Sequence, residues 1–136
     1  MKMLLRNQRF QMFICLVLVI FLMSSISSAL GNQDEELQKK FSAILGDYEF
    51  DLTEFGGEVL ILKIHIDTGS LWGDSGDGKP ITLEPAGDEP YEFTADDPDS
   101  GALEIKFLKD DQGEYTICTI ALLDMGVEIT GIKIKQ

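Results

Sequence analysis

From residue 47 to its end, the chain is divided into short strand-like runs by clusters of glycine, proline and aspartate. Runs rich in aromatic and β-branched residues, separated by such turn residues, are typical of β-strands joined by tight connections. We expect eight strands, near Tyr48–Leu52, Glu58–Asp67, Ser70–Asp74, Pro80–Glu84, Pro90–Ala95, Ala102–Lys109, Glu114–Leu122 and Val127–Lys135. Their even spacing indicates an antiparallel meander, and hence a barrel or a sandwich. Strands do not alternate with helices, which excludes nucleotide-binding α/β folds.

The alternation inside the strands predicts which side chains face the core. In the second run, every second residue from Leu60 to Ile66 is apolar and lies on one face, whereas His65 lies on the other. The sixth run places Leu103, Ile105 and Phe107 on a common face. Closing eight strands into a barrel removes edges that invite aggregation. It leaves an interior just wide enough for side chains or one small ligand.

The last run, from Val127 to Ile134, changes phase halfway along its length, so that its first and last apolar residues fall on opposite faces. An extra residue inserted in the strand would restore a single apolar face. We therefore predict a β-bulge at Gly131. With this bulge, Lys133 and Lys135 would both face solvent.

A helix is predicted over residues 32–45, before the first strand. Its apolar residues, Leu37, Phe41, Ile44 and Leu45, recur at helical spacing and form one stripe. Asn32 can cap the start of the helix, with Glu35 as its capping-box partner, and Gly46 is a natural stop. We expect the stripe to pack against the strands; a helix that binds a partner is the alternative.

Residues 1–31 have the pattern of a secretory signal peptide: a basic start, an apolar run of twelve residues from Met12 to Met23, and a small-residue segment with Ala29 in a cleavage position. A secreted or periplasmic location is expected. The alternative is a membrane anchor over residues 10–30, but this stretch reaches the roughly 20 apolar residues of a spanning helix only if its serines are counted.

From Asn32 onward, the chain has 24 acidic residues against 8 lysines and no arginine, so its net charge is −16. A body this acidic cannot supply the basic face that nucleic-acid binding requires, nor can it dock on anionic lipids. Cys118 is its only cysteine. An exported protein with one thiol has no internal disulfide, so its stability must come from a buried apolar core.

Several short motifs, in this order, resemble the lipocalin-like barrel domain at the C-terminus of β-lactamase-related serine hydrolases. They are Leu45-Gly46-Asp47-Tyr48-Glu49, Leu60–Asp67, Gly69-Ser70-Leu71, Ile81-Thr82-Leu83-Glu84-Pro85, Tyr91-Glu92-Phe93, Leu103-Glu104-Ile105-Lys106-Phe107 and Asp110 to Gly113. The resemblance covers roughly residues 45–135. It implies an up-and-down lipocalin-like barrel over residues 46–136 that is an accessory module, because in that family the hydrolase chemistry belongs to a separate domain. The chain lacks that domain's Ser-x-x-Lys motif.

A hydrolase site is one alternative, because Gly73-Asp74-Ser75-Gly76 copies the sequence around the nucleophile of chymotrypsin-like proteases. His65 and Asp67 precede it. A catalytic triad needs a histidine in hydrogen-bond reach of the serine and a buried acid to orient it. Since His65 is predicted to face outward, Asp67 would be an exposed neighbour. We favour a hairpin turn, in which these residue types supply the backbone geometry.

A calcium-binding extracellular module is another alternative. Asp97, Asp99 and Glu104 provide alternating carboxylates in a glycine-terminated loop, and calcium binds several oxygen ligands in such loops. The spacing does not match an EF-hand. A transition-metal site is not expected, because His65 and Cys118 are the only soft ligands after residue 31. Charged turns are the simpler interpretation, and no cofactor is expected.

Aromatic residues occur in most of the predicted strands. Trp72, Tyr91, Phe93, Phe107 and Tyr115 would line the interior of a barrel, either as a filled core or as the wall of an apolar ligand cavity. The filled core is favoured because short strands leave little spare volume. The sequence thus predicts a non-catalytic accessory or binding module, which engages an exported partner protein such as a hydrolase, or a small apolar ligand.

Overall fold

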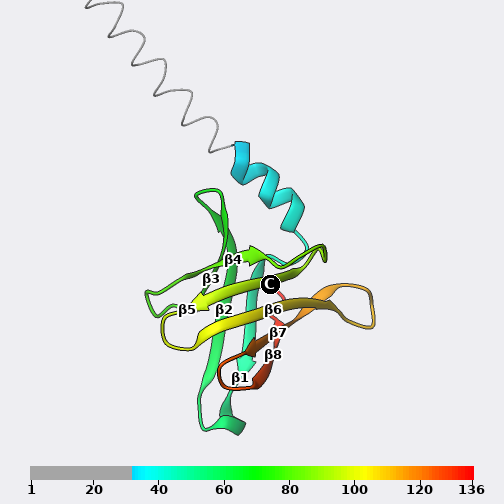
Figure 1. Cartoon of the computed structure of the whole chain (residues 1–136). Coiled ribbons are helices and arrows are strands. Elements are labelled where there is room, and N and C mark those ends of the chain that lie inside the picture. Colours follow the sequence, from blue (N-terminus) through cyan, green and yellow to red (C-terminus); the bar gives the residue numbers. More distant parts are fainter. Residues whose placement is uncertain (1–31) are drawn as a thin grey trace, which may run out of the picture.

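In the computed structural model, which describes residues 32–136, eight antiparallel strands form a closed barrel in which each strand pairs with its neighbours in sequence and β1 closes on β8 (Figure 1). The strands are β1 Gly46–Asp51, β2 Val59–Asp67, β3 Ser70–Asp74, β4 Ile81–Pro85, β5 Glu92–Asp97, β6 Gly101–Lys109, β7 Tyr115–Leu122 and β8 Val127–Lys133, with a 3-10 helix, η1, at Thr53–Phe55. The predicted eight-stranded barrel is therefore confirmed. The predicted signal peptide, residues 1–31, and the alternative anchor, residues 10–30, lie outside the described residues.

One helix, over residues 32–41, precedes the barrel and lies across one end of it (Figure 1). The helix ends four residues before the predicted boundary at Leu45, because the chain turns where the Ile44 amide donates to the Phe41 carbonyl. Phe41 and Ile44 are buried, so the apolar stripe packs on the barrel as predicted. None of the helices in the described part of the chain is long and apolar enough to cross a membrane.

The up-and-down order gives the barrel two different ends. The end beneath the helix carries the connections at residues 68–69, 86–91 and 110–114, and we call it the closed end. The opposite end carries the connections at residues 52–58, 75–80, 98–100 and 123–126, and we call it the open end. The Asp34 carboxylate accepts a hydrogen bond from the Gly69 amide, which fixes the helix to a turn of the closed end.

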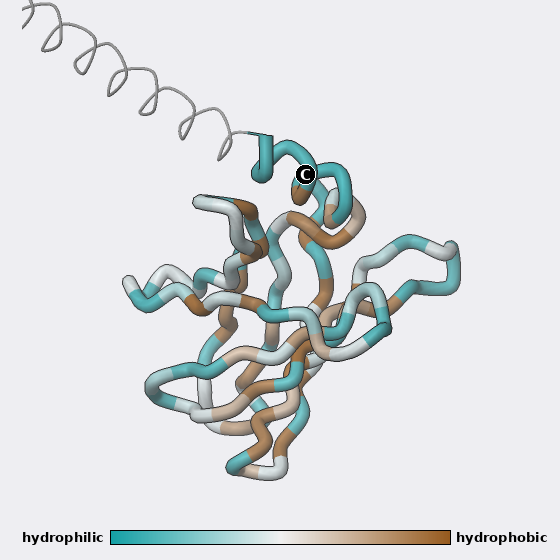
Figure 2. Tube along the Cα trace, turned by 45° about the horizontal axis from the view of Figure 1, so that its top comes forward, coloured by the Kyte–Doolittle hydropathy of each residue, from teal (hydrophilic) through white to brown (hydrophobic). Residues whose placement is uncertain are grey.

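Inward-facing positions follow the predicted alternation, and Figure 2 shows hydrophobic and hydrophilic segments interleaved along the strands. Leu62 and Ile64 of β2 are buried, whereas Lys63 between them is exposed. The buried core consists of Phe41, Ile44, Tyr48, Phe50, Leu62, Ile64, Leu71, Leu83, Phe93, Ala95, Leu103, Ile105, Phe107, Cys118 and Ile120. The inward faces predicted for β2 and β6 are confirmed, because β-strands alternate with a period of two.

The predicted bulge at Gly131 is wrong. β8 pairs with β7 in one continuous register from Val127 to Ile132. Gly131 faces inward, where a Cβ atom would lie 2.6 Å from the Phe50 ring, so the ring fills the space of the missing side chain. Ile132 consequently faces outward and is 54% exposed. A shift in register occurs instead between Leu108 and Lys109 of β6.

Lys133 does not simply face solvent, because it follows the inward phase of Gly131. Its ammonium Nζ donates to the Ala43 carbonyl at 3.1 Å and lies 5.9 Å from the centre of the Tyr48 ring. Partial burial lowers the pKa of Lys133 below its ordinary value. This lysine thus fastens the end of β8 to the turn after the helix, whereas Lys135 is exposed as predicted.

Candidate binding site

An apolar pocket of about 140 Å³ lies inside the barrel at its open end. Its wall is aliphatic, with Leu60, Leu62, Leu103, Ile120, Leu122 and Ile129 contributed by four strands. Each of these side chains occupies an inward position of its strand. Gly73 of β3 also lines the pocket, and a Cβ atom there would lie 3.3 Å from the Leu83 side chain. The pocket therefore exists because small and branched side chains meet at this end.

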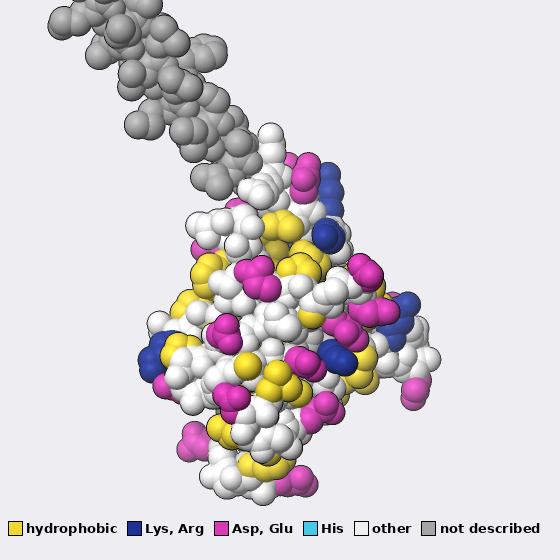
Figure 3. Space-filling model, viewed as in Figure 1, with side chains coloured by type: hydrophobic (Ala, Val, Ile, Leu, Met, Phe, Trp, Pro, Cys, Tyr) yellow, Lys and Arg dark blue, Asp and Glu magenta, His cyan; other side chains and the backbone are white. Residues whose placement is uncertain are grey.

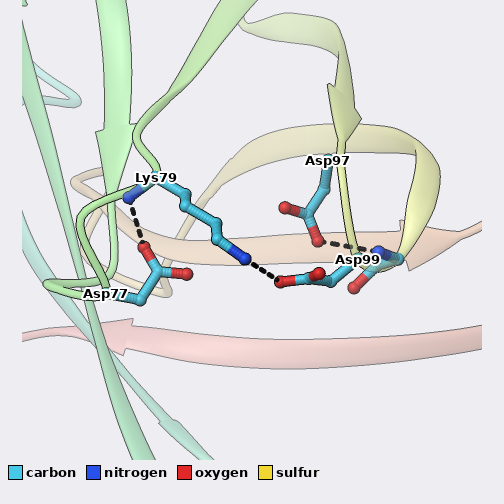
Figure 4. Close-up of polar contacts among 5 residues, drawn as sticks. Asp77, Lys79, Asp97 and Asp99 are labelled. Atoms are coloured by element: carbon cyan, nitrogen blue, oxygen red, sulfur yellow. Dashed lines mark hydrogen bonds and ion pairs between the residues drawn. The ribbon is translucent and has the colours of Figure 1, made fainter.

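Charged residues form a rim at the mouth of the pocket, on the β3–β4 and β5–β6 connections (Figure 4). Lys79 lies 3.2 Å from the carboxylate of Asp99 and joins the two connections. The Asp77 carboxylate accepts a hydrogen bond from the Lys79 amide, and the Asp97 carboxylate accepts one from the Ser100 amide. Both partners of the ion pair are more than half exposed, and pairs of this kind contribute little to stability. The ion pair therefore adds little to the attachment of the two connections to each other.

The aromatic residues proposed from the sequence do not line this pocket. Phe93 and Phe107 are buried at the closed end, with their ring centres 5.9 Å apart. Tyr91 and Tyr115 pack edge to face with their ring centres 4.5 Å apart, beside the same end. The favoured interpretation of these aromatics as a filled core therefore describes the closed end. The cavity lies elsewhere, among aliphatic side chains.

Trp72 is not an interior residue. In β3, Leu71 and Gly73 are buried, so Trp72 between them lies on the outer face, opposite His65 of β2. Its indole Nε1 donates to the Asp67 carbonyl at 3.0 Å. The tryptophan covers the sheet from outside. Sequence reasoning counted it with the interior aromatics although the period-two alternation of β3 already places it on the opposite face from Leu71.

The hydrolase alternative is not supported by the positions of its residues. His65 faces outward next to Trp72, whereas Ser75 follows the end of β3 and lines the interior pocket. The two side chains lie on different sides of the sheet. The Nδ1 atom of His65 is buried and, within residues 32–136, has no hydrogen-bond partner, so no acid orients the ring. These residues do not form a triad.

The three candidate calcium ligands do not form a common site. Asp97 accepts a hydrogen bond from the Ser100 amide in the turn, and Asp99 pairs with Lys79. Glu104 is exposed on β6, as the fourth residue of that strand. Among the described residues, no group of three or more His, Cys, Asp or Glu side chains is arranged to hold a metal ion. The acidic turns are stabilised by their own backbone hydrogen bonds.

Two buried polar groups lie away from the pocket. Burial raises the pKa of the Cys118 thiol to about 12, and it raises the pKa of the Tyr48 hydroxyl as well. That hydroxyl donates to the Ile44 carbonyl at 2.7 Å. Both groups stay protonated near neutral pH. Cys118 is thus an unreactive core residue, and Tyr48 a link between the barrel and the segment before it.

Sequence analysis identified the inward phase of Leu60, Leu62 and Leu103 but not the pocket that they line. One feature of the sequence could have indicated the pocket: the inward side chains near one end of the barrel are aromatic, and those near the other end are aliphatic. This difference can be recognised only when the direction of each strand is known. The sequence matches no protein-family model, and no curated protein or solved structure shows significant similarity to it. The resemblance to an accessory barrel of serine hydrolases therefore stays a prediction.

Proposed function

We propose that this protein is a non-catalytic binding module that holds a small apolar ligand, or the apolar end of a larger one, in the open end of the barrel. The observation that carries the proposal is the aliphatic pocket, which opens to solvent between the β3–β4 and β5–β6 connections. A cavity of about 150 Å³ lined by aliphatic and aromatic side chains is known to stay dry and to bind benzene. The pocket here has nearly that size.

The size of the pocket limits the ligand. Sites for drug-sized molecules usually measure about 300–1,000 Å³. The pocket can therefore enclose one ring or a chain of about six carbon atoms, and anything longer would extend through the mouth. Binding would remove apolar surface from water on both sides, which is the main source of affinity in such sites.

The polar groups at the mouth already have partners in the connections that carry them. Asp77 and Asp97 accept hydrogen bonds from the backbone of their own turns, and Lys79 is paired with Asp99. These contacts shape the mouth and leave the aliphatic wall as the surface that a ligand meets. The aliphatic wall offers packing to an apolar ligand, and the hydroxyl and charged side chains of the lining, such as Ser75 and Lys79, lie in or next to the connections at the mouth.

A titration with benzene, followed by methyl NMR of the isoleucine and leucine residues, tests the proposal. Saturable shifts are expected at the methyl groups of Leu60, Leu122 and Ile129. The methyl groups of Ile44, at the closed end, should not respond. Shifts spread evenly over both ends, or no shift up to the solubility limit of benzene, would overturn the proposal.

A pair of variants on β8 provides the matched control. Ile129→Phe adds volume inside the pocket, because Ile129 lines it. Ile132→Phe makes the same change on the outer face of the same strand. Benzene binding should be lost in Ile129→Phe and retained in Ile132→Phe, provided that both variants keep the native amide spectrum. Retention in both would show that benzene binds elsewhere.

A further inference from the structure

The boundary between β4 and β5, which we call the seam, is the least paired one in the barrel, with two paired positions against three between β1 and β8. These strands pair only at Glu84–Thr94 and Pro85–Phe93, near the closed end. On its other side, β5 pairs with β6 along its whole length, from Glu92 to Asp97. Residues 81–83 of β4 and residues 95–97 of β5 are therefore extended but have no strand partner across the seam.

A groove of about 440 Å³ lies at this seam, on the side facing out of the barrel. Thr82 and Glu84 of β4 form one wall, and Thr94 and Asp96 of β5 form the other. Ile81 and Leu103 provide an apolar base. These two residues also line the pocket at the open end, so the seam is the partition between the groove and the barrel interior.

An unpaired strand edge is a template for another strand, because its backbone N–H and C=O groups can pair with those of an added chain. β4 and β5 remain neighbours in the closed barrel, so the free edge is limited to the parts of the two strands that lie beyond their two paired positions. Proteins that recognise extended peptides use such edges: the backbone pairing supplies affinity, and contacts to alternate side chains supply specificity. The groove beside the edge has room for those side chains.

The acidic side chains at the groove favour a partner segment with a positive charge. Glu84 and Asp96 are exposed, and neither belongs to the two ion pairs found among the described residues, Lys79–Asp99 and Lys106–Glu92. Among residues 32–136, no lysine or arginine lines the groove. Figure 3 shows acidic side chains over much of one face, with few basic ones between them. A basic segment would therefore be attracted to this seam, and an acidic one repelled.

We propose that the β4–β5 seam binds an extended basic segment of a partner protein by strand addition. The segment pairs with the free edges at residues 81–83 and 95–97. Side chains of a strand alternate between its two faces, so basic residues at every second position meet Glu84 and Asp96, and the small apolar residues between them lie on Ile81 and Leu103. This site is separate from the proposed ligand pocket and does not depend on its being occupied.

The experiment uses the blocked peptide acetyl-Lys-Val-Lys-Val-Lys-Val-Lys-amide, titrated into the ¹⁵N-labelled chain. Amide shifts are expected at residues 81–83 and 95–97. A peptide with glutamate in place of lysine should not bind. A third peptide, with N-methyl groups on its valines, keeps every side chain but loses backbone donors, and its affinity should fall by at least about tenfold. Equal binding of the N-methylated peptide would mean that charge alone attracts it, and would overturn strand addition.

Two charge variants locate the site. Glu84→Gln combined with Asp96→Asn removes two charges from the groove, and peptide affinity should fall several-fold. Asp88→Asn combined with Glu89→Gln removes two charges from the β4–β5 connection at the closed end, and the affinity should change little. Equal losses in both would assign binding to the net charge and reject the seam. Benzene binding in the open-end pocket should be unchanged by either pair, so failure of one proposal is distinguishable from failure of the other.

Discussion

The two ends of the barrel are built from the same strands but differ in how their interiors are filled. At the closed end, the Phe107 ring packs against those of Tyr48 and Phe93, and the Phe41 ring meets that of Phe93 with centres 5.6 Å apart. At the open end, aliphatic side chains surround the pocket. Exposed apolar side chains also gather there, including Phe55 and Met125 on the connections.

The difference teaches that alternation decides which residues point inward, whereas side-chain size and the presence of a cover decide whether an end is solid. Aromatic side chains fill far more volume than aliphatic ones and dominate the energetics of a core. The helix then covers the closed end, and its Phe41 is 4% exposed. We infer that the closed end carries most of the stability, which leaves the open end free to keep a cavity.

The largest expected effect comes from shortening one inward residue at each end. Phe107→Ala should lower the free energy of unfolding by about 3–5 kcal/mol, because it creates a cavity in a filled region. Ile129→Ala should cost less, since the side chain already borders empty space and its removal enlarges an existing pocket. Urea unfolding of both variants measures this. Equal losses would contradict the contrast between the ends.

A glycine pair examines the same contrast by adding volume. Gly131→Ala should cost about 1–3 kcal/mol, because the new methyl group would meet the Phe50 ring at 2.6 Å. Gly73→Ala places its methyl group on the pocket wall, 3.3 Å from the flexible end of Leu83, and should be nearly neutral. Thermal unfolding compares the two. A Gly73→Ala variant that is as unstable as Gly131→Ala would show that the pocket wall is rigid.

A tyrosine pair tests how the closed end is attached to the segment before it. Tyr48→Phe removes the buried hydroxyl that donates to Ile44, and should cost about 1–2 kcal/mol because a carbonyl is left without its donor. Tyr115→Phe, beside the same end, removes a hydroxyl that makes no hydrogen bond within residues 32–136 and serves as the control. Urea unfolding should separate them, and equal stability of the two would assign no role to the Tyr48 hydroxyl.

The smallest expected effect is on the loss of stability at acid pH. Hydrogen bonds from Thr53 lower the pKa of Asp51 at the open end, and the Glu114 amide, with Thr116 and Gln112, lowers that of Asp110 at the closed end. A carboxyl whose pKa is lower in the folded state stabilises the fold above its unfolded pKa, and this contribution is lost as pH falls through the folded pKa. Stability should therefore decrease as the pH falls below about 4, the ordinary pKa of an aspartate carboxyl.

Asp51→Asn and Asp110→Asn should each flatten part of this acid dependence, measured as thermal midpoints from pH 5 to pH 2. Asp88→Asn is the control, because its carboxylate accepts no hydrogen bond in the described part of the chain. An unchanged profile in both test variants would assign the acid sensitivity to the summed charge of the surface. Because Asp51 is exposed and Asp110 is only partly buried, we expect shifts of the midpoint smaller than those of the core variants.

Much of the fold could be predicted because a period of two needs no tertiary information. Leu62, Ile64 and Ile105 are buried as the alternation indicates, and the glycine and aspartate clusters fall in the connections. The prediction for β8 is wrong because it assumed that all apolar residues of the strand face inward, which would require a bulge. Gly131 takes the inward position without a bulge, because the ring of Phe50 fills the space where its side chain would be. Phe50 lies 81 positions earlier in the chain.

The candidate site was predicted less well. Sequence reasoning proposed Trp72 and four other aromatics, yet the pocket is aliphatic, and of the residues proposed for calcium only Asp97 lines it. Aromatic residues are easy to identify in a sequence, whereas no single residue type indicates a cavity. It arises where several short side chains from different strands fail to meet.

The sequence by itself determined the number of strands, their order, the inward faces of strands such as β2 and β6, and the acidity of the surface, because these follow from local periodicity and composition. The tertiary structure decided which end is filled, where the pocket lies, and that β4 and β5 cease to pair beyond Glu84 and Thr94. These properties depend on distances between residues far apart in the chain, and on how volumes add across the barrel. Strand periodicity contains no information about either.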